Sequence, residues 1–359
     1  ALAGFPHHSL NTYLPKLVKA GLRVAICDQL EDPKMTKSIV KRGVTELVTP
    51  GVSMNDEVLH SKSNNFLASV YFGKKQIGVS FLDVSTGEFL TAQGNDEYID
   101  KLLQNFNPSE VLIPKIHKNN FRETFGEEYH HFYLEDWIYK EDYAMETLTN
   151  HFQTATLKGF GIEELSEGII ASGAILYYLS ETQHNKRQHI TTIQRIAEDA
   201  YVWMDRFTIR NLELYHSYNP SAVTLLDVID KTLSPMGGRL LKRWMALPLK
   251  DSKKILSRHE VVGYLKNNQE ILKSIQFQIK QISDLERLIS KIAAGKVTPR
   301  EVVYLKDSLD AILPIKALAL ESEQKSVKTI GQQLDSCDVL RAKIEATLNQ
   351  EAPVAIAKG

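Results

Sequence analysis

Two stretches of the sequence begin like catalytic motifs, and both are incomplete. A phosphate-cradling loop requires the pattern G-x-x-x-x-G-K-[ST], but the glycine–lysine pair closest to it, Gly295-Lys296, lacks the upstream glycine. His259-Glu260 starts like the helix of a zinc protease, yet Gly263 stands where the second histidine ligand is required. The sequence therefore excludes a P-loop and predicts no zinc site.

Asp83 is the acid whose position is most suited to metal chemistry. It ends an apolar run, and several carboxylates at the end of a sheet can hold two metal ions beside a phosphate. Glu88, Glu110 and Asp136 are conceivable companions. Alternatively, Asp83 simply accepts hydrogen bonds from the turn at 85–87. We favour this second interpretation, because nuclease chemistry needs a convergent set of carboxylates.

Basic side chains form a first group in the loop that leaves the N-terminal segment. Lys37, Lys41 and Arg42 lie close together there. Contact with the phosphates of a nucleic acid and plain solvent exposure both remain open for them.

The helix expected near 237–247 carries a second basic group and is amphipathic. Its apolar residues share one face: Leu240, Leu241, Trp244 and Met245. The basic residues share the other face at helical spacing: Arg239, Lys242 and Arg243. This basic face is a candidate contact for phosphate or for an acidic neighbouring domain. The favoured interpretation is a solvated polar face above a buried apolar one.

Different secondary structure is expected to position these residues in the two halves of the chain. The first half contains β-rich runs with short connections, typical of an antiparallel meander, at 66–72, 77–84 and 88–92. Further strands near 110–113 and 129–134 and helices near 95–106, 140–151 and 164–182 complete an α/β unit. Beyond short β-rich stretches at 190–196 and 201–204, helical periodicity dominates. Capping boxes are expected at 283–286 and 298–301, and Pro314 should kink or end the helix that begins after Thr298.

Charge divides the chain into three segments, although the net charge is only −1. Residues 1–48 carry seven Lys/Arg and four Asp/Glu, whereas residues 49–183 carry nine and twenty, and residues 184–359 carry twenty-seven and twenty. An acidic segment between two basic ones indicates separate modules with separate partners. Thr49-Pro50-Gly51 is a boundary signal, and helical periodicity takes over after residue 184, so we place domain boundaries at 48/49 and 183/184.

Composition is that of an ordinary globular protein in a reducing compartment. The 359 residues are 43% hydrophobic and 24% charged, and only two are cysteines, Cys27 and Cys337. No apolar run approaches the roughly 20 residues that span a bilayer. A soluble, cytoplasmic protein without a membrane partner is expected. Because the chain starts without methionine and within an element, we expect it to be an internal piece of a longer protein.

Seven stretches of the sequence, taken together, resemble the MutS family of mismatch-repair proteins. They are AGFPHH (3–8) with YL (13–14), VAICDQLEDP (24–33), VTPG (48–51), LDVSTGEF (82–89), GFG (159–161), RNLE (210–213) and TLSPMGGRLLKRW (232–244). They follow the order of the family and cover nearly the whole chain.

The resemblance implies a fold class of α/β followed by mostly α. Residues 1–48 would be the C-terminal end of the mismatch-binding domain. Residues 49–183 would be the connector domain, which has an RNase H-like fold with a mixed sheet and no nuclease chemistry. Residues 184–359 would be the helical core and lever, ending before the clamp domain.

The resemblance also implies a function without catalysis in this chain. The family reads mismatches with a Phe-x-Glu element expected before Ala1, and its P-loop ATPase is expected beyond Gly359. The chain would thus be a structural, signal-transmitting segment with no cofactor of its own, while the whole protein binds ATP and Mg²⁺. Its partners would be mismatched duplex DNA, a MutL-type protein (through the connector) and a second copy in a homodimer. The alternative is an RNase H-like, metal-dependent nuclease with a helical accessory domain.

Overall fold

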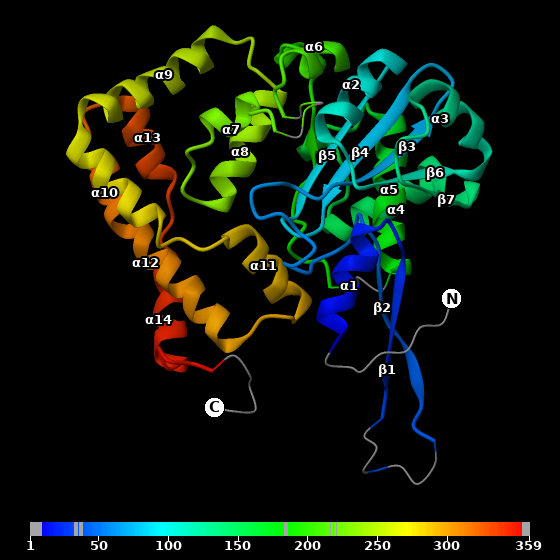
Figure 1. Ribbon diagram of the computed structural model, residues 1–359, viewed down its shortest axis with the longest axis horizontal. Helices are drawn as coiled ribbons and strands as arrows, with labels where there is room; N and C mark the ends of the chain where they lie inside the picture. The colour runs from blue at the N-terminus through cyan, green and yellow to red at the C-terminus, as the bar shows by residue number, and fades with distance from the viewer. Residues whose placement is uncertain are drawn as a thin grey trace. The chain divides into compact units, whose positions relative to one another are not determined.

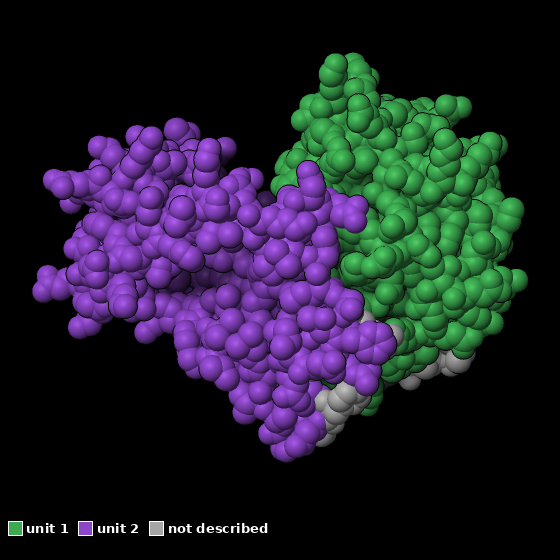
Figure 2. All heavy atoms as spheres, turned by 90° about the horizontal axis from the view of Figure 1, so that it is seen from above, with its two compact units in different colours: residues 1–197 green, residues 198–359 purple. Residues whose placement is uncertain are grey.

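The chain forms two compact units, residues 1–197 and residues 198–359 (Figures 1 and 2). The computed structural model describes residues 9–31, 35, 39–182, 186–215, 217, 219 and 221–353. The first unit contains a mixed sheet with helices, and the second is almost entirely helical. This confirms the expected order of an α/β part followed by a mostly α part.

The first unit begins with a helix and a two-stranded ribbon. Helix α1 (Leu10–Lys19) leads into strand β1 (Val24–Gln29), which pairs antiparallel with β2 (Arg42–Val48). From the sequence, Arg42 was expected in the loop that leaves the N-terminal segment. That placement is wrong, because Arg42 opens β2 and pairs with Gln29.

A six-stranded mixed sheet forms the centre of the first unit, in the order β7-β6-β3-β4-β5-β8. Its strands are β3 (Leu67–Phe72), β4 (Ile77–Asp83), β5 (Glu88–Gly94), β6 (Glu110–Pro114), β7 (His131–Leu134) and β8 (Gln194–Arg195). The antiparallel meander β3-β4-β5 is confirmed. Parallel pairing then adds β6 and β7 beyond β3, and β8 beyond β5. The strand expected at 190–196 shrinks to the two residues of β8.

Helices fill the connections of this unit. They are α2 (Asp96–Phe106), η2 (Lys115–His117), α3 (Lys118–Phe125), η3 (Asp136–Tyr139), α4 (Glu141–Phe152), η4 (Lys158–Phe160) and α5 (Ser166–Glu181). Helix α5 packs on β3, β4 and α4 and is buried on almost every side. Gly78 of β4 permits this packing, since a Cβ there would lie 2.0 Å from the carbonyl oxygen of Glu167.

The second unit is a helical array. Its elements are η5 (Glu198–Ala200), α6 (Arg206–Asn211), α7 (Leu225–Ile229), α8 (Pro235–Ala246), α9 (Ser252–Asn267), α10 (Gln269–Ile279), α11 (Leu285–Ala294), α12 (Pro299–Glu321), α13 (Lys325–Gln333) and α14 (Asp338–Thr347). The strand expected at 201–204 is only an isolated bridge between Tyr201 and Leu249. Over the ranges that the structure describes, no helix has the length and apolarity to cross a membrane.

Helix ends in this unit test three local predictions. The capping box of Thr298 and Glu301 is confirmed, with Pro299 in the first turn. The helix does not end at Pro314, because α12 continues through it to Glu321, and the alternative of a kink there stays a prediction. The box expected at 283–286 is also wrong: Asp284 caps α11 instead, accepting from the backbone N–H of Arg287.

Candidate functional sites

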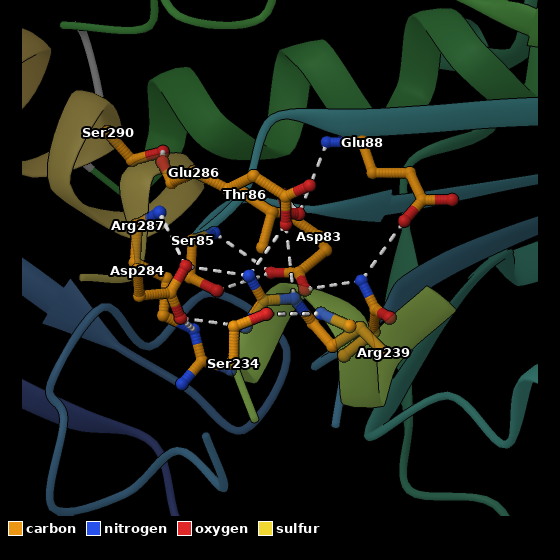
Figure 3. Close-up of polar contacts among 12 residues, drawn as sticks. Asp83, Ser85, Thr86, Glu88, Ser234, Arg239, Asp284, Glu286, Arg287 and Ser290 are labelled. Atoms are coloured by element: carbon orange, nitrogen blue, oxygen red, sulfur yellow. Dashed lines mark hydrogen bonds and ion pairs between the residues drawn. The ribbon is translucent and has the colours of Figure 1, made fainter. Parts of the chain in front are cut away.

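Asp83 is fully buried at the end of β4, where its carboxylate is saturated with neutral donors (Figure 3). One oxygen accepts from the backbone N–H and hydroxyl of Ser85, at 2.9 and 2.7 Å. The other accepts from the side-chain amide of Asn64 at 2.9 Å and the backbone N–H of Asn65 at 3.1 Å. Four donors leave no free lone pair directed at a metal, so Asp83 holds the turn together, as favoured from the sequence.

The acids considered as companions of Asp83 do not converge with it into a metal site. Glu88 shares the amide of Asn64 at 3.1 Å, but Glu110 is engaged elsewhere, and Asp136 accepts from the backbone N–H of Ile116 at 3.0 Å. Among the residues that the structure describes, no group of three metal-binding side chains occurs. The nuclease alternative is therefore not favoured.

Glu110 forms a joint between the N-terminal ribbon and the sheet. Its buried carboxylate accepts from the hydroxyl of Thr49, from the backbone N–H of Gly51 at 3.1 Å and from the hydroxyl of Tyr178 at 2.7 Å. Thr49 directly follows β2, Glu110 opens β6 and Tyr178 lies in α5. Burial and the neighbouring charge of Glu110 raise the pKa of Tyr178 far above its usual value, so Tyr178 stays a proton donor.

Arg23 adds a second contact across this joint. Its guanidinium lies 3.6 Å from the ring centroid of Phe132 and 5.6 Å from that of Tyr178. Such stacking of a cation on aromatic rings is worth about 0.5–1 kcal/mol at an exposed site. The start of β1 is thereby fixed to β7 and α5, and the end of β2 is fixed through Thr49.

The first basic group lies partly at the end of this ribbon. Lys41 and Arg42 are exposed there, beside the pairing of Arg42 with Gln29. Lys37 lies outside the described residues. Exposed cations at the end of a projecting ribbon suit contact with phosphate, and this role stays a prediction.

On α8, the expected division into a buried apolar face and a solvated basic face is wrong. Arg239 is only 4% exposed, whereas Leu240 and Trp244 are 45% and 41% exposed. The guanidinium of Arg239 binds Asp284 in a bidentate pair at 2.7 and 2.8 Å and also donates to Glu286 at 2.6 Å (Figure 3). The planar guanidinium can bind both oxygens of one carboxylate. Arg239 is buried because it pairs with the acids at the start of α11.

The two other cations of this helix are half-buried. Burial lowers the pKa of Lys242, although the negative charges of Asp230 and Asp227 act to raise it. It also lowers the pKa of Arg243, which Glu286 partly offsets. Trp244 is covered on one side by the guanidinium of Arg258, 3.6 Å from the ring centroid. The second basic group is therefore part of the packing of this unit more than a free electrostatic surface.

Comparison with known proteins accounts for nearly all of the chain. Family models described as MutS domain I, MutS domain II and MutS domain III match residues 1–57, 65–191 and 207–359. The chain belongs to the MutS family. It is 82% identical over 359 residues to a protein named DNA mismatch repair protein MutS from Flavobacterium johnsoniae, and 80% identical to one of the same name from Flavobacterium psychrophilum. A MutS from Parabacteroides distasonis is 56% identical over 358 residues.

The chain spans only part of these MutS relatives. All of its residues are matched, but they make up 41% of the Flavobacterium johnsoniae protein and 42% of the Flavobacterium psychrophilum protein. Lys41 and Arg42 fall in the part matched by MutS domain I, Asp83 and Glu110 in the part matched by domain II, and Arg239 in the part matched by domain III.

Sequence reasoning missed the joint at Glu110, although it named that residue. A hint was available, because an acid opening the apolar strand Glu110–Pro114 must be buried with it and needs donors. The sequence could not identify these donors, since Thr49 and Tyr178 are 61 and 68 residues away.

Proposed function

We propose that this chain is a structural, signal-transmitting segment of a DNA mismatch-recognition ATPase. In this proposal residues 1–48 end the mismatch-binding domain, residues 49–183 are the connector, and residues 184–359 belong to the core and lever, except that β8 (Gln194–Arg195) completes the sheet of the connector. The matches to MutS domains I, II and III, in that order, support these roles.

The joint at Glu110 is the observation that carries the transmitting role. The donors of this buried carboxylate come from separate segments of the chain. Loss of any one of these hydrogen bonds would destabilise the unit, because a charge without its donors is unfavourable away from water. Displacement of the ribbon would therefore move β6 and α5 with it. Coupling between distant sites requires such a contiguous physical connection.

We assign the sheet of the first unit an RNase H-like fold with no nuclease chemistry. The mixed sheet, an antiparallel meander extended by the parallel strands β6 and β7, supports this fold. The four neutral donors around Asp83 support the absence of metal-dependent cleavage.

The cofactors and partners in this proposal belong to the whole protein, acting in the cytoplasm. ATP and Mg²⁺ would bind outside this chain, whose sequence contains no P-loop pattern. Mismatched duplex DNA, a second copy in a homodimer and a MutL-type protein docking on the connector would be the partners. Titration of this chain with Mg-ATP should accordingly release no heat.

Exchange of the matched segment in a relative tests the proposal. We expect the Flavobacterium johnsoniae MutS, with its matched segment replaced by this chain, to restore a low mutation frequency in cells that lack their own copy. Glu110→Gln in this chimera should raise the mutation frequency at an unchanged protein level, because an NH2 donor then replaces one of the two oxygens that accept from Thr49, Gly51 and Tyr178 and the negative charge is lost. The matched control is Glu123→Gln on the exposed side of α3. A chimera that accumulates normally but leaves the mutation frequency high would contradict the proposal.

A further inference from the structure

Three aromatic side chains of the first unit form a cluster that reaches the surface. Trp137 comes from η3, Tyr143 from α4 and Tyr177 from α5. We propose that this cluster, the Trp137 face, is a docking surface for a protein segment that presents arginine side chains.

The geometry of the Trp137 face is fixed by the rings themselves. The centroid of the Trp137 ring lies 5.3 Å from that of Tyr143 and 5.4 Å from that of Tyr177, with the planes at 72° and 82°. The two tyrosine rings lie 6.2 Å apart at 70°. These are edge-to-face arrangements, which hold each ring in place. The rings are therefore already ordered before a partner binds, so binding would lose little side-chain conformational entropy.

Trp137 is not needed to fill the core beneath it. Ile138 and Tyr139, the next two residues of η3, are buried and anchor this segment. Trp137 itself remains 47% exposed. Tyr143 and Tyr177 are half-buried and support Trp137 from below. Tryptophan and tyrosine are enriched among the few residues that carry most of the energy of protein–protein binding, so an exposed tryptophan on such a support is a candidate for such a site.

Charge around the Trp137 face selects the chemistry of the partner. Between residues 135 and 142 the chain carries four acids and one lysine, and all five side chains are exposed: Glu135, Asp136, Lys140, Glu141 and Asp142. Lys115 forms an ion pair with Glu135 and neutralises part of this charge. Glu181 faces Tyr177 from the same helix, and burial together with this carboxylate raises the pKa of Tyr177.

The nearby cation Arg187 interacts electrostatically with Tyr143, but hydrogen bonds hold its guanidinium on α5. Its guanidinium donates inward, to the carbonyl oxygen of Leu176 at 2.7 Å and the hydroxyl of Ser180 at 3.0 Å. An acidic rim around aromatic rings attracts a cation and repels the phosphates of a nucleic acid.

Arginine fits this combination better than lysine. Its planar guanidinium stacks on aromatic rings while its N–H groups reach neighbouring carboxylates. Among the described residues this stacking is seen for Arg23 on Phe132 and for Arg258 on Trp244, each at 3.6 Å. The inference rests on the proposed partner-binding role of this unit and names the surface and the chemistry of that role.

Fluorescence of Trp137 provides a direct test in the full chain. The chain has three tryptophans, so Trp203→Phe and Trp244→Phe together leave Trp137 as the reporter. The probe is a short peptide of alternating arginine and alanine, with a glutamate–alanine peptide as its counterpart. We expect the arginine peptide to change the fluorescence of Trp137 saturably and the glutamate peptide to leave it unchanged.

Variants separate the Trp137 face from general attraction to an acidic unit. With a dye-labelled arginine peptide, Trp137→Ala should weaken binding about twofold to fivefold, as loss of one stacked cation implies. Trp137→Phe should keep most of the affinity and also guards against a folding defect. Glu141→Lys and Glu181→Lys should weaken binding more than the control Glu123→Lys, which makes the same charge change on α3.

Two results would overturn the inference. One is equal weakening by all three lysine variants with no effect of Trp137→Ala, since binding would then reflect net charge alone. The other is a saturable response of Trp137 to duplex DNA in place of the arginine peptide. Neither depends on mutation frequency in the chimera, so failure of this inference is distinguishable from failure of the proposed function.

Discussion

Buried charges in this chain depend on a few fixed partners, and Arg239 is the clearest case. Replacing it with alanine leaves Asp284, whose side chain is only 18% exposed, without its bidentate partner. Removal of one member of a buried pair typically costs 3–5 kcal/mol. Because Glu286 is half-exposed and recovers hydration, we expect Arg239→Ala to lower the free energy of unfolding by about 3 kcal/mol. Urea denaturation measures this, with exposed Lys253→Ala as the control; equal losses in both variants would contradict the ion-pair account.

His189 gives the first unit a dependence on pH. Burial lowers the pKa of its imidazole, although a bond to the carbonyl oxygen of Val84 and the charge of Asp83 act in the opposite direction. The unfolded chain therefore binds the proton first, near pH 6.5, and stability present above that pH is lost as the pH falls. We expect His189→Gln to flatten the fall in unfolding free energy between about pH 7 and 5, while exposed His259→Gln leaves it unchanged. A parallel decline in all three proteins would rule His189 out as the cause.

The range of an interaction along the chain decided which residue roles were predictable. The role of Asp83 followed from the sequence because its Ser85 donors lie two residues away, within one turn. Arg239 was assigned to the wrong face because its partner Asp284 lies 45 residues further on. Helical periodicity predicts the face on which a side chain lies. It does not predict which residue of another element contacts that face, because this depends on the tertiary structure.

Elements with local signals were predictable for the same reason. Alternating patterns and short turns indicated β3, β4 and β5, and the pattern of Thr298 to Glu301 indicated the start of α12. The polar helix α3 carries few apolar residues and was missed. The helix does not end at Pro314, because packing on α10, α13 and α14 stabilises α12 despite the lost hydrogen bond.

Helix α5 lies against β4 only because residue 78 has no side chain. An added Cβ would lie 2.0 Å from the carbonyl oxygen of Glu167 and 2.6 Å from the backbone nitrogen of Gly168. These are backbone atoms of a helix, which cannot relieve the clash by a change of rotamer. Overpacking of this kind costs about 1–3 kcal/mol or more. Thermal unfolding should therefore show a markedly lower midpoint for Gly78→Ala. Gly159→Ala is the control, since no atom lies within 4 Å of its added Cβ, and similar midpoints for both would refute this packing.

For the whole chain, the distribution of charge predicts weak binding to DNA without mismatch preference. Residues 1–48 and 184–359 carry the excess of Lys and Arg, whereas residues 49–183 repel phosphate. Each phosphate neutralised contributes about −0.9 to the log–log slope of affinity against salt, so binding should fade near physiological ionic strength.

Fluorescence anisotropy on homoduplex and G·T duplex across a salt series measures this. Charge reversal at Lys37, Lys41 and Arg42 should weaken binding equally on both duplexes. A preference for G·T of about tenfold, worth about 1.4 kcal/mol, would instead mean that this chain reads the mispair itself.

Strand β8 has a consequence for any shorter version of the first unit. Helix α5 packs on the sheet first, and the chain then returns to pair Gln194 and Arg195 with β5. The backbone N–H of Ile196 donates to the backbone carbonyl oxygen of Thr91. A piece ending at residue 183 would leave these backbone groups of β5 open, and a bare strand edge is a template for self-association. We expect residues 9–183 to form oligomers that grow with concentration in light scattering, and residues 9–197 to stay monodisperse. Strand β8 thus covers the edge of β5 and should limit aggregation of the first unit.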